Sequence, residues 1–239
     1  MAAWEGRMNV IDEAITWLND PLNWSGPGGI WALTREHLLM TLAAVLLASV
    51  VAIPLGIWLG HSHRLQRGAA TVIVAANTTR ALPTLAIIII LATAGLFGDT
   101  ATVIAAAVFA FPVLLSTTFT GVRGVDPAVT DAARGMGMGG GRVVGRVELP
   151  LAVPYLAAGL RTTIVQVVAT IPLAALAGGG GLGQIISLGF GTQRYGQVLA
   201  GGVVVAVLCL LVDGVLALVQ RAVTPASVRA ESRAAARAV

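Results

Sequence analysis

The sequence predicts an all-α integral membrane protein with five spans, and three observations support this prediction. Of the 239 residues, 56% are hydrophobic and only 11% are charged, a balance that water-soluble domains do not have. Five stretches are apolar enough, and long enough, to cross a bilayer core, which needs about 20 such residues per helix. The arginines gather in alternate connections between these stretches, as cytoplasmic loops require.

The segment 1–35 precedes the first span and is predicted to be extracytoplasmic. This segment contains four tryptophans, Trp4, Trp17, Trp24 and Trp31. Because tryptophan prefers the interface between water and lipid, residues 8–19 are expected to form a short surface helix. A turn follows at "NWSGPGG". The segment has several acidic residues and no apolar core, so it does not resemble a signal peptide.

The predicted membrane domain covers residues 36–221. Its spans are expected over residues 38–60, 68–97, 100–120, 151–177 and 198–220. Prolines fall inside four of these spans: Pro54, Pro83, Pro112 and Pro172. Each proline removes an internal hydrogen bond, which a membrane helix tolerates when neighbouring helices cover the freed carbonyl. The spans are therefore expected to pack together in an assembly.

Arginine placement predicts the orientation. The arginines that follow the first span, the third span and the fifth span are Arg64, Arg67, Arg123, Arg134, Arg142, Arg146, Arg221, Arg229, Arg233 and Arg237. Positively charged loops stay in the cytoplasm, so the N-terminus is expected outside and the tail 222–239 inside. This charge is spread over several loops and forms no continuous patch, which argues against nucleic acid as a partner.

The chain is expected to bind no cofactor and no metal of its own. It contains no lysine, so it cannot form the lysine-containing phosphate loop of an ATPase despite its 29 glycines. Its histidines, His37, His61 and His63, lie at span ends on two sides of the predicted membrane, which disfavours a common metal site. The single cysteine, Cys209, lies in an apolar run and is expected to be a packing residue.

The connection from Gly121 to Pro150 is long, charged and rich in helix signals. Asp126 is suited to cap a helix, and Pro127 is suited to its first position. That helix is expected to end near Gly137, and a second short helix over 142–148 is expected to lead to Pro150. The surface of the first of these two helices carries mainly small residues, Ala132, Ala133, Gly135 and Gly137. A helix with so few large side chains can enter a groove of another protein.

This connection resembles the coupling-loop signature of binding-protein-dependent ABC importer permeases. That signature reads Glu-Ala-Ala, three residues, Gly, nine residues, Ile, one residue and Leu-Pro. The matching positions here are occupied by Asp131, Ala132, Ala133, Gly137, Val147, Leu149 and Pro150. The chain departs from the signature twice, with Asp in place of Glu and Val in place of Ile.

The resemblance extends over residues 34–221. Over this range the chain is similar to the permeases of osmoprotectant importers, those for glycine betaine, carnitine or choline. It rests on "LTREHLLMTL", "GVRGVDPAVTDAARGMGM", "VELPLAVPYLAAGLRT" and "LAALAGGGGLGQIISLG". Permeases of methionine importers share the five-span layout and remain an alternative. Gln184 stands where the osmoprotectant family often has an acidic residue.

The resemblance implies a type I ABC importer permease fold, like that of methionine permeases, with cytoplasmic coupling helices. It implies that a separate cytoplasmic ATPase binds ATP and Mg and receives the helix Asp126–Gly137 in a cleft. It further implies an extracytoplasmic substrate-binding protein and a second permease copy or paralogue. The chain would then be a non-catalytic subunit of the cytoplasmic membrane, surrounded by lipid.

Polar residues inside the spans are candidates for the translocation pathway, because they are costly in lipid. In the second span these are Asn77, Thr78, Thr79, Arg80 and Thr84, and in the fourth they are Gln166, Thr163 and Thr170. Asp99 and Asp213 are candidate partners for Arg80. The alternatives are an arginine that reaches the interface or bonds to carbonyls, and threonines that bond to their own helix.

Two other classes of protein were weighed. A stand-alone channel or secondary transporter needs no ATPase and gives no reason for the spacing of the coupling signature. An intramembrane enzyme needs a catalytic set, and the sequence has neither a Ser/His/Asp arrangement nor an H-E-x-x-H motif. The run Gly178–Gln184 is expected to form a tight or re-entrant turn on the outer side.

Overall fold

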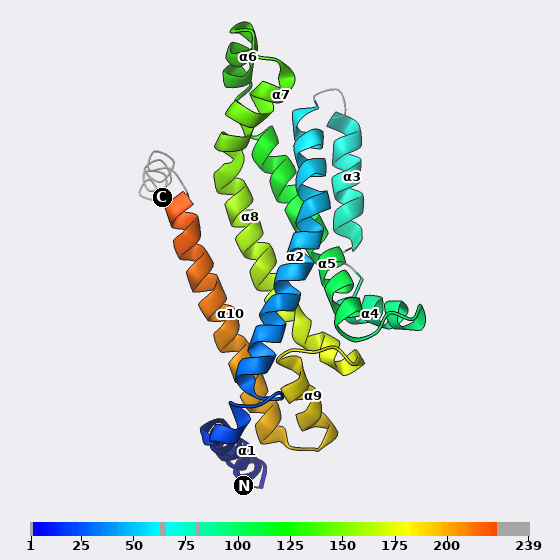
Figure 1. Ribbon diagram of the computed structural model, residues 1–239, viewed down its shortest axis with the longest axis vertical. Helices are drawn as coiled ribbons and strands as arrows, with labels where there is room; N and C mark the ends of the chain where they lie inside the picture. The colour runs from blue at the N-terminus through cyan, green and yellow to red at the C-terminus, as the bar shows by residue number, and fades with distance from the viewer. Residues whose placement is uncertain (1, 63–65, 80–81, 224–239) are drawn as a thin grey trace. The chain divides into compact units, whose positions relative to one another are not determined.

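The computed structural model describes residues 2–62, 66–79 and 82–223, and its regular elements there are helices (Figure 1). The α-helices are α1 (Ala2–Asn19), α2 (Ile30–His61), α3 (Gln66–Thr78), α4 (Thr84–Thr93), α5 (Gly98–Arg123), α6 (Pro127–Gly135), α7 (Gly140–Val143), α8 (Leu149–Thr170), α9 (Gly183–Gly191) and α10 (Tyr195–Val223). Three shorter elements are the 3-10 helix η1 (Pro21–Asn23), the π-helix η4 (Val144–Glu148) and the 3-10 helix η5 (Ile171–Ala177). The prediction of an all-α chain is confirmed.

Four helical stretches in the described residues are long and apolar enough to cross a membrane. They are Ile30–His61, Gly98–Arg123, Gly140–Ala177 and Tyr195–Ala222. Each contains one of the predicted spans, so four of the five spans are confirmed as continuous apolar helical stretches. The fourth is a composite, because α7, η4, α8 and η5 follow one another without a loop.

The second predicted span, 68–97, is not one continuous helix. The structure contains two shorter apolar helices instead, α3 and α4. Pro83 stands directly before α4 with an extended ψ of 131°, and its ring cannot donate the backbone hydrogen bond that a continuous helix needs. With only 10 residues, α4 is about 15 Å long, half the thickness of a bilayer core.

The N-terminal segment folds onto the beginning of α2, and residues 8–19, where a short helix was predicted, lie within α1. Asp20 caps the short helix η1 by accepting a hydrogen bond from the backbone N–H of Leu22 at 3.0 Å. The indole Nε1 of Trp24 donates to the carbonyl oxygen of Leu18 at 2.7 Å. The same indole packs against Trp31, with ring centroids 5.6 Å apart. These contacts fix the turn "NWSGPGG" as a folded connection.

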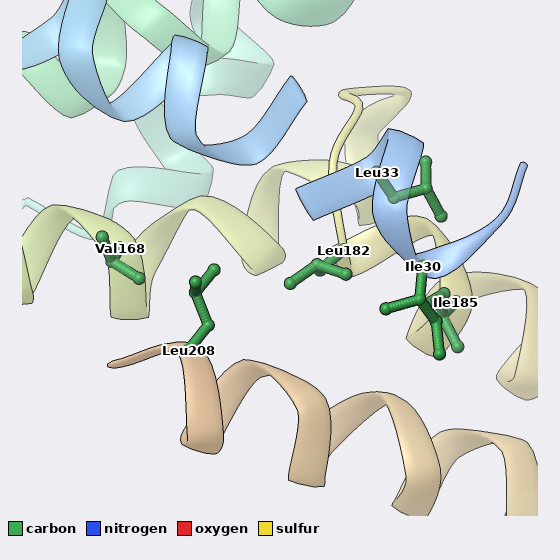
Figure 2. Packing of buried hydrophobic residues seen from close by; sticks show 6 residues of the cluster. All are labelled: Ile30, Leu33, Val168, Leu182, Ile185 and Leu208. Carbon is green, nitrogen blue, oxygen red and sulfur yellow. The ribbon is translucent and has the colours of Figure 1, made fainter. Parts of the chain in front are cut away.

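The described residues divide into two compact units. The first (unit 1) takes its residues from 1–48, 78–110 and 164–212, and the second (unit 2) takes its residues from 49–77, 111–163 and 213–239. Unit 1 has an apolar core built by α2, α8, α9, α10 and the turn before α9. Figure 2 shows its side chains converging. The core residues are Ile30, Leu33, Val168, Leu182, Ile185 and Leu208. Cys209 packs against this cluster, as its position in an apolar run predicts.

Unit 2 is held together by small residues where helices meet. On α2, Gly56 faces Thr118 of α5, and Gly60, one turn later, faces Val122. Side-chain atoms of Thr118 and Val122 lie 2.7 Å and 2.9 Å from the place where a Cβ of these glycines would be. The two backbones approach so closely because the glycines have no side chain, as in many membrane helix pairs.

Two of the long helices expose apolar surface. On α2 the exposed large side chains include Leu39, Leu42, Leu46, Val50 and Trp58, and on α10 they include Val207, Leu210, Leu211, Val215 and Leu218. No part of the most apolar window of α10 is buried within the chain. Surfaces of this kind are typical of contact with lipid or with a second membrane subunit.

Candidate functional site

The predicted helix in the charged connection is present as α6, and both of its ends follow from its sequence. Asp126 caps it by accepting a hydrogen bond from the N–H of Ala128 at 2.8 Å, and Pro127 is its first residue. After α6 the chain reverses at Gly137, which has a φ of +84°. Residues with side chains rarely adopt this left-handed conformation, so glycine ends the helix here.

The outer surface of α6 differs from the prediction in one respect. Ala132 and Gly135 are exposed, as expected, but Ala133 is buried, and Met136 just after the helix is 73% exposed. With Val129, which is 43% exposed, Ala132 and Met136 form an apolar stripe at helical spacing, which we call the α6 stripe. The surface is therefore apolar and only partly bare. Asp131 and Arg134 form an exposed ion pair at 3.1 Å, which contributes little to stability.

The second half of the connection is not a separate short helix, contrary to the prediction for 142–148. It runs into α8 through α7 and the π-helix η4 (Figure 1). Three signature residues lie at this junction: Val147 and Leu149 are half-buried and Pro150 is exposed.

The junction is held by an ion pair that the sequence did not reveal. The Nδ1 atom of His61, at the end of α2, lies 2.9 Å from both carboxylate oxygens of Glu148. Glu148 is only 3% exposed, so the carboxylate depends on this partner. Glu148 occupies the unspecified position between Val147 and Leu149, and the only sequence signal was an acidic residue at the start of an apolar span.

The candidate pathway residues around Pro83 lie in two helices and the break between them. Asn77, near the end of α3, donates through Nδ2 to the carbonyl oxygen of Ile73 and to the hydroxyl of Ser116, both at 2.9 Å. Thr78 and Thr79 are exposed and Thr84 is half-buried at the start of α4. Arg80 lies outside the described residues.

The candidate pathway residues in α8 divide into two kinds. Thr170 donates to the carbonyl oxygen of Gln166 at 2.7 Å, and Thr163 donates to that of Gly159 at 2.8 Å. Both threonines thus bond to their own helix, which confirms the alternative considered for them. Gln166 is different, because its Oε1 is buried and accepts no hydrogen bond from the described residues.

Both acidic residues predicted as partners for Arg80 accept hydrogen bonds from other residues. Asp213 of α10 accepts two hydrogen bonds from Arg161 of α8, at 2.7 Å and 2.8 Å. Arg161 also donates to the side-chain oxygen of Gln220 at 3.3 Å. Asp99 accepts a hydrogen bond from the N–H of Gly180 at 2.9 Å. Sequence reasoning missed Arg161 as a structural residue because its partners are about 50 positions away.

A cavity of about 290 Å³ in unit 2 is lined by residues of α5 and α8, and its surface is mainly apolar. Its polar residues are Ser116, Thr117, Thr120, Tyr155 and Thr162. Ser116 also bonds to Asn77, so one predicted pathway residue contacts this lining. The signal in the sequence was the run "STTFT" at 116–120, which places four hydroxyls in the last two turns of an apolar span.

The glycine-rich run beginning at Gly178 is a tight turn, as predicted. Gly178 and Gly181 have φ values of +82° and +72°. A side chain on Gly179 would approach Thr102, and one on Gly180 would overlap Glu36. Gln184, where the osmoprotectant permeases often have an acidic residue, is exposed at the beginning of α9.

Long apolar helices joined by capped helical connections define a class of protein, the multi-pass membrane proteins. The chain belongs to the family of binding-protein-dependent transport system inner membrane components, which matches residues 52–225. It is therefore the membrane component of a binding-protein-dependent ABC transporter and not its catalytic subunit.

Two curated relatives of Bacillus subtilis (strain 168) are similar to most of the chain. The glycine betaine/carnitine/choline transport system permease protein OpuCB is 36% identical over 80% of this chain and 87% of its own. The choline transport system permease protein OpuBB is 36% identical over 82% of this chain and 89% of its own. Among solved structures, an inward-facing MetNI methionine ABC transporter matches with a TM-score of 0.71 and 24% identity, over 87% of this chain and 100% of that chain. The latter likeness shows the fold alone.

Proposed function

We propose that the chain is the permease subunit of an ATP-driven importer for a compatible solute such as glycine betaine, choline or carnitine. The observation that carries this proposal is the 36% identity to two permeases named for these solutes, each over at least 80% of this chain. The sequence stretches that resemble osmoprotectant permeases agree with it. An importer for methionine or another amino acid remains the alternative, since the fold is shared with a methionine transporter.

The proposed arrangement is the five-span type I fold, with its second crossing over residues 68–97. The N-terminal segment 1–35 lies outside, the domain 36–221 spans the membrane, and the tail 222–239 lies in the cytoplasm. Support comes from the arginines of the connection 121–150 and of the chain after α10, because positive charge marks the cytoplasmic side.

In the proposed mechanism α6 is the coupling helix. It enters a cleft of the partner ATPase, which holds ATP and Mg, and it presents the α6 stripe to that cleft. Because α7 and η4 run into α8 without a loop, movement of the ATPase against the connection is passed to α8. The His61–Glu148 pair passes the same movement to α2. The other partners are an extracytoplasmic binding protein and a second permease copy or paralogue.

The proposed passage for the solute follows the polar residues of the spans. It includes the predicted set Asn77, Thr78, Thr79, Arg80, Thr84, Gln166 and Thr170, together with the cavity of unit 2. Two observations support this assignment: the buried Oε1 of Gln166 lacks a donor among the described residues, and Asn77 bonds to a hydroxyl of the cavity lining. Specificity for the solute is expected to reside mainly in the binding protein.

The test is uptake of labelled glycine betaine after a salt upshift, in cells that express the complete transporter. Wild-type chain is compared with Ala132→Arg, which places a charge in the centre of the α6 stripe without a glycine conformation being lost. Ser25→Arg is the matched control, because Ser25 is equally exposed but lies in the segment expected outside. Co-purification of the ATPase is measured with each variant.

We expect Ala132→Arg to lower uptake by about tenfold or more and to weaken co-purification, while Ser25→Arg leaves both unchanged. Normal uptake by Ala132→Arg would refute the coupling role of α6. Wild-type cells that import labelled methionine but not betaine, choline or carnitine would refute the substrate class.

A further inference from the structure

An open pocket of about 600 Å³ lies in unit 1, between α1 with its following turn and the beginning of α10. Its volume is within the usual range of small-molecule sites. The residues that matter for its chemistry are Asp12, Glu13, Trp17, Asp20, Arg194 and Gln197. None of them belongs to the predicted coupling connection or to the predicted pathway.

The pocket combines charges of both signs that do not neutralise each other. Asp12, Glu13 and Asp20 contribute carboxylates, and Arg194 contributes a guanidinium. Arg194 shares this pocket with three carboxylates, and within the described residues it forms no ion pair with any of them. Separated and unpaired charges of opposite sign are complementary to a ligand that itself carries both.

Two further side chains point to a ligand with a bulky cation. Trp17 lines the pocket and is half-buried, and an indole face attracts a cation that is poorly hydrated. Gln197 also lines the pocket although it is only 7% exposed, and its Nε2 donates to the carbonyl oxygen of Ile185 at 3.2 Å. Its Oε1 receives no hydrogen bond from the described residues and is accessible to solvent, so it is an acceptor open to a ligand or water.

The backbone holds this pocket in place. Gly196, at the beginning of α10, lets α1 approach so closely that a Cβ there would overlap the Cβ of Glu13. Gln193 has a φ of +56°, and within the described residues it is the one non-glycine residue with a positive φ. Such a conformation persists only where the surroundings enforce it. The strained turn directly precedes Arg194.

We propose that this pocket binds a zwitterionic quaternary ammonium solute. The carboxylates and Trp17 hold the cationic end, and Arg194 holds the carboxylate end. A quaternary ammonium group cannot donate hydrogen bonds, so an aromatic face and carboxylates are its suitable partners, whereas a carboxylate is well matched to a guanidinium.

This inference rests on the proposed function and narrows it. It favours solutes such as glycine betaine, which carry a carboxylate, over choline, which does not. The part of the lining from α1 and η1 lies before residue 52, where the family match begins, so the site is a feature of this chain beyond the matched region.

The test is equilibrium binding of labelled glycine betaine, and separately of labelled choline, to the full-length chain in lipid nanodiscs. The variants are Arg194→Gln, Asp12→Asn and, as a matched control, Arg35→Gln. Arg35 is an exposed arginine of the same unit that does not line the pocket. Uptake by the complete transporter is measured with the same variants.

We expect Arg194→Gln to weaken glycine betaine binding by about tenfold and choline binding by less than about twofold, while Asp12→Asn weakens both. Arg35→Gln is expected to bind both solutes like wild type. Absence of betaine binding to the wild-type chain, or an equal loss of both solutes in Arg194→Gln, would overturn the inference. If uptake of betaine persists in that case, the proposed function still stands; if uptake is also absent, both fall.

Discussion

Two glycine-rich runs lie before and after the composite helix that contains α8, and they differ in what surrounds them. In the first run, 137–141, a Cβ on Gly137, Gly139 or Gly141 would meet nothing within 4 Å. In the second run, 178–183, a Cβ on Gly179 would lie 2.5 Å from the hydroxyl of Thr102, and one on Gly183 would overlap the backbone of Pro172. The two runs are therefore similar in composition, but the first has open space around it and the second is closely surrounded by other residues.

The difference separates glycines that the chain itself needs from glycines that leave space. The second run is small because helices of unit 1 occupy the space around it. The first run has open space in the chain itself, so its small size leaves room for a partner, apart from Gly137, whose backbone conformation requires glycine. Three substitutions test this distinction, in order of decreasing effect on the free energy of unfolding.

The largest effect is expected for Gly183→Ala. The new methyl group would collide with the backbone of Pro172 and with the Cβ of Ala175, and neither can move without displacing η5. Overpacking of this kind costs about 3 kcal/mol. The measurement is the thermal unfolding midpoint of the detergent-solubilised chain, followed by circular dichroism. An unchanged midpoint would show that the second run is not closed by its neighbours.

An intermediate effect is expected for His61→Ala, at the junction beside the first run. The change leaves the buried carboxylate of Glu148 without its partner, which lowers the free energy of unfolding. We expect a loss of about 2 kcal/mol, less than for a fully buried pair, because the His61 side chain is partly exposed. The same unfolding measurement checks this value. The double change His61→Ala with Glu148→Gln is the control and should recover part of the loss, since no unpaired charge remains. If the double variant is as unstable as the single one, the ion pair is not the cause.

The smallest effect is expected for Gly141→Ala in the first run. Nothing opposes the added methyl group, and alanine favours α7 over glycine, so stability should rise by about 0.5 kcal/mol. Gly140→Ala, whose Cβ would lie 3.4 Å from Nε2 of His61, serves as the comparison and should be close to neutral. A loss of more than about 1 kcal/mol in Gly141→Ala would show that the first run packs against the chain after all.

The sequence was sufficient for the elements that depend on local signals. Continuous apolar length predicted four spans, and Asp126 with Pro127 and Gly137 predicted both ends of α6, because capping and backbone conformation are decided within a few residues. The helix over residues 8–19 and the turn near the N-terminus were found for the same reason. Apolar composition alone did not show that the helix is interrupted at Pro83 within the second predicted span.

The candidate site was less predictable wherever it depended on pairing across the chain. The bonds of Glu148 to His61 and of Arg161 to Asp213 join residues 87 and 52 positions apart, and no local pattern specifies such partners. The threonines of α8 could be assigned to their own helix because that bond is local. The pocket near Trp17 required the close approach of α1 to Gly196, which only the folded chain reveals.

The π-helix at 144–148 has a consequence for how the two ends of the composite helix relate. A π turn contains about one residue more than an α turn, and one residue corresponds to a rotation of about 100° around a helix axis. Side chains before and after it therefore belong to different stripes, although the helix is continuous. The π-helix acts like one inserted residue, which rotates the side chains after it around the helix axis. The residues that face the connection and those that face the neighbouring spans can therefore vary independently of each other.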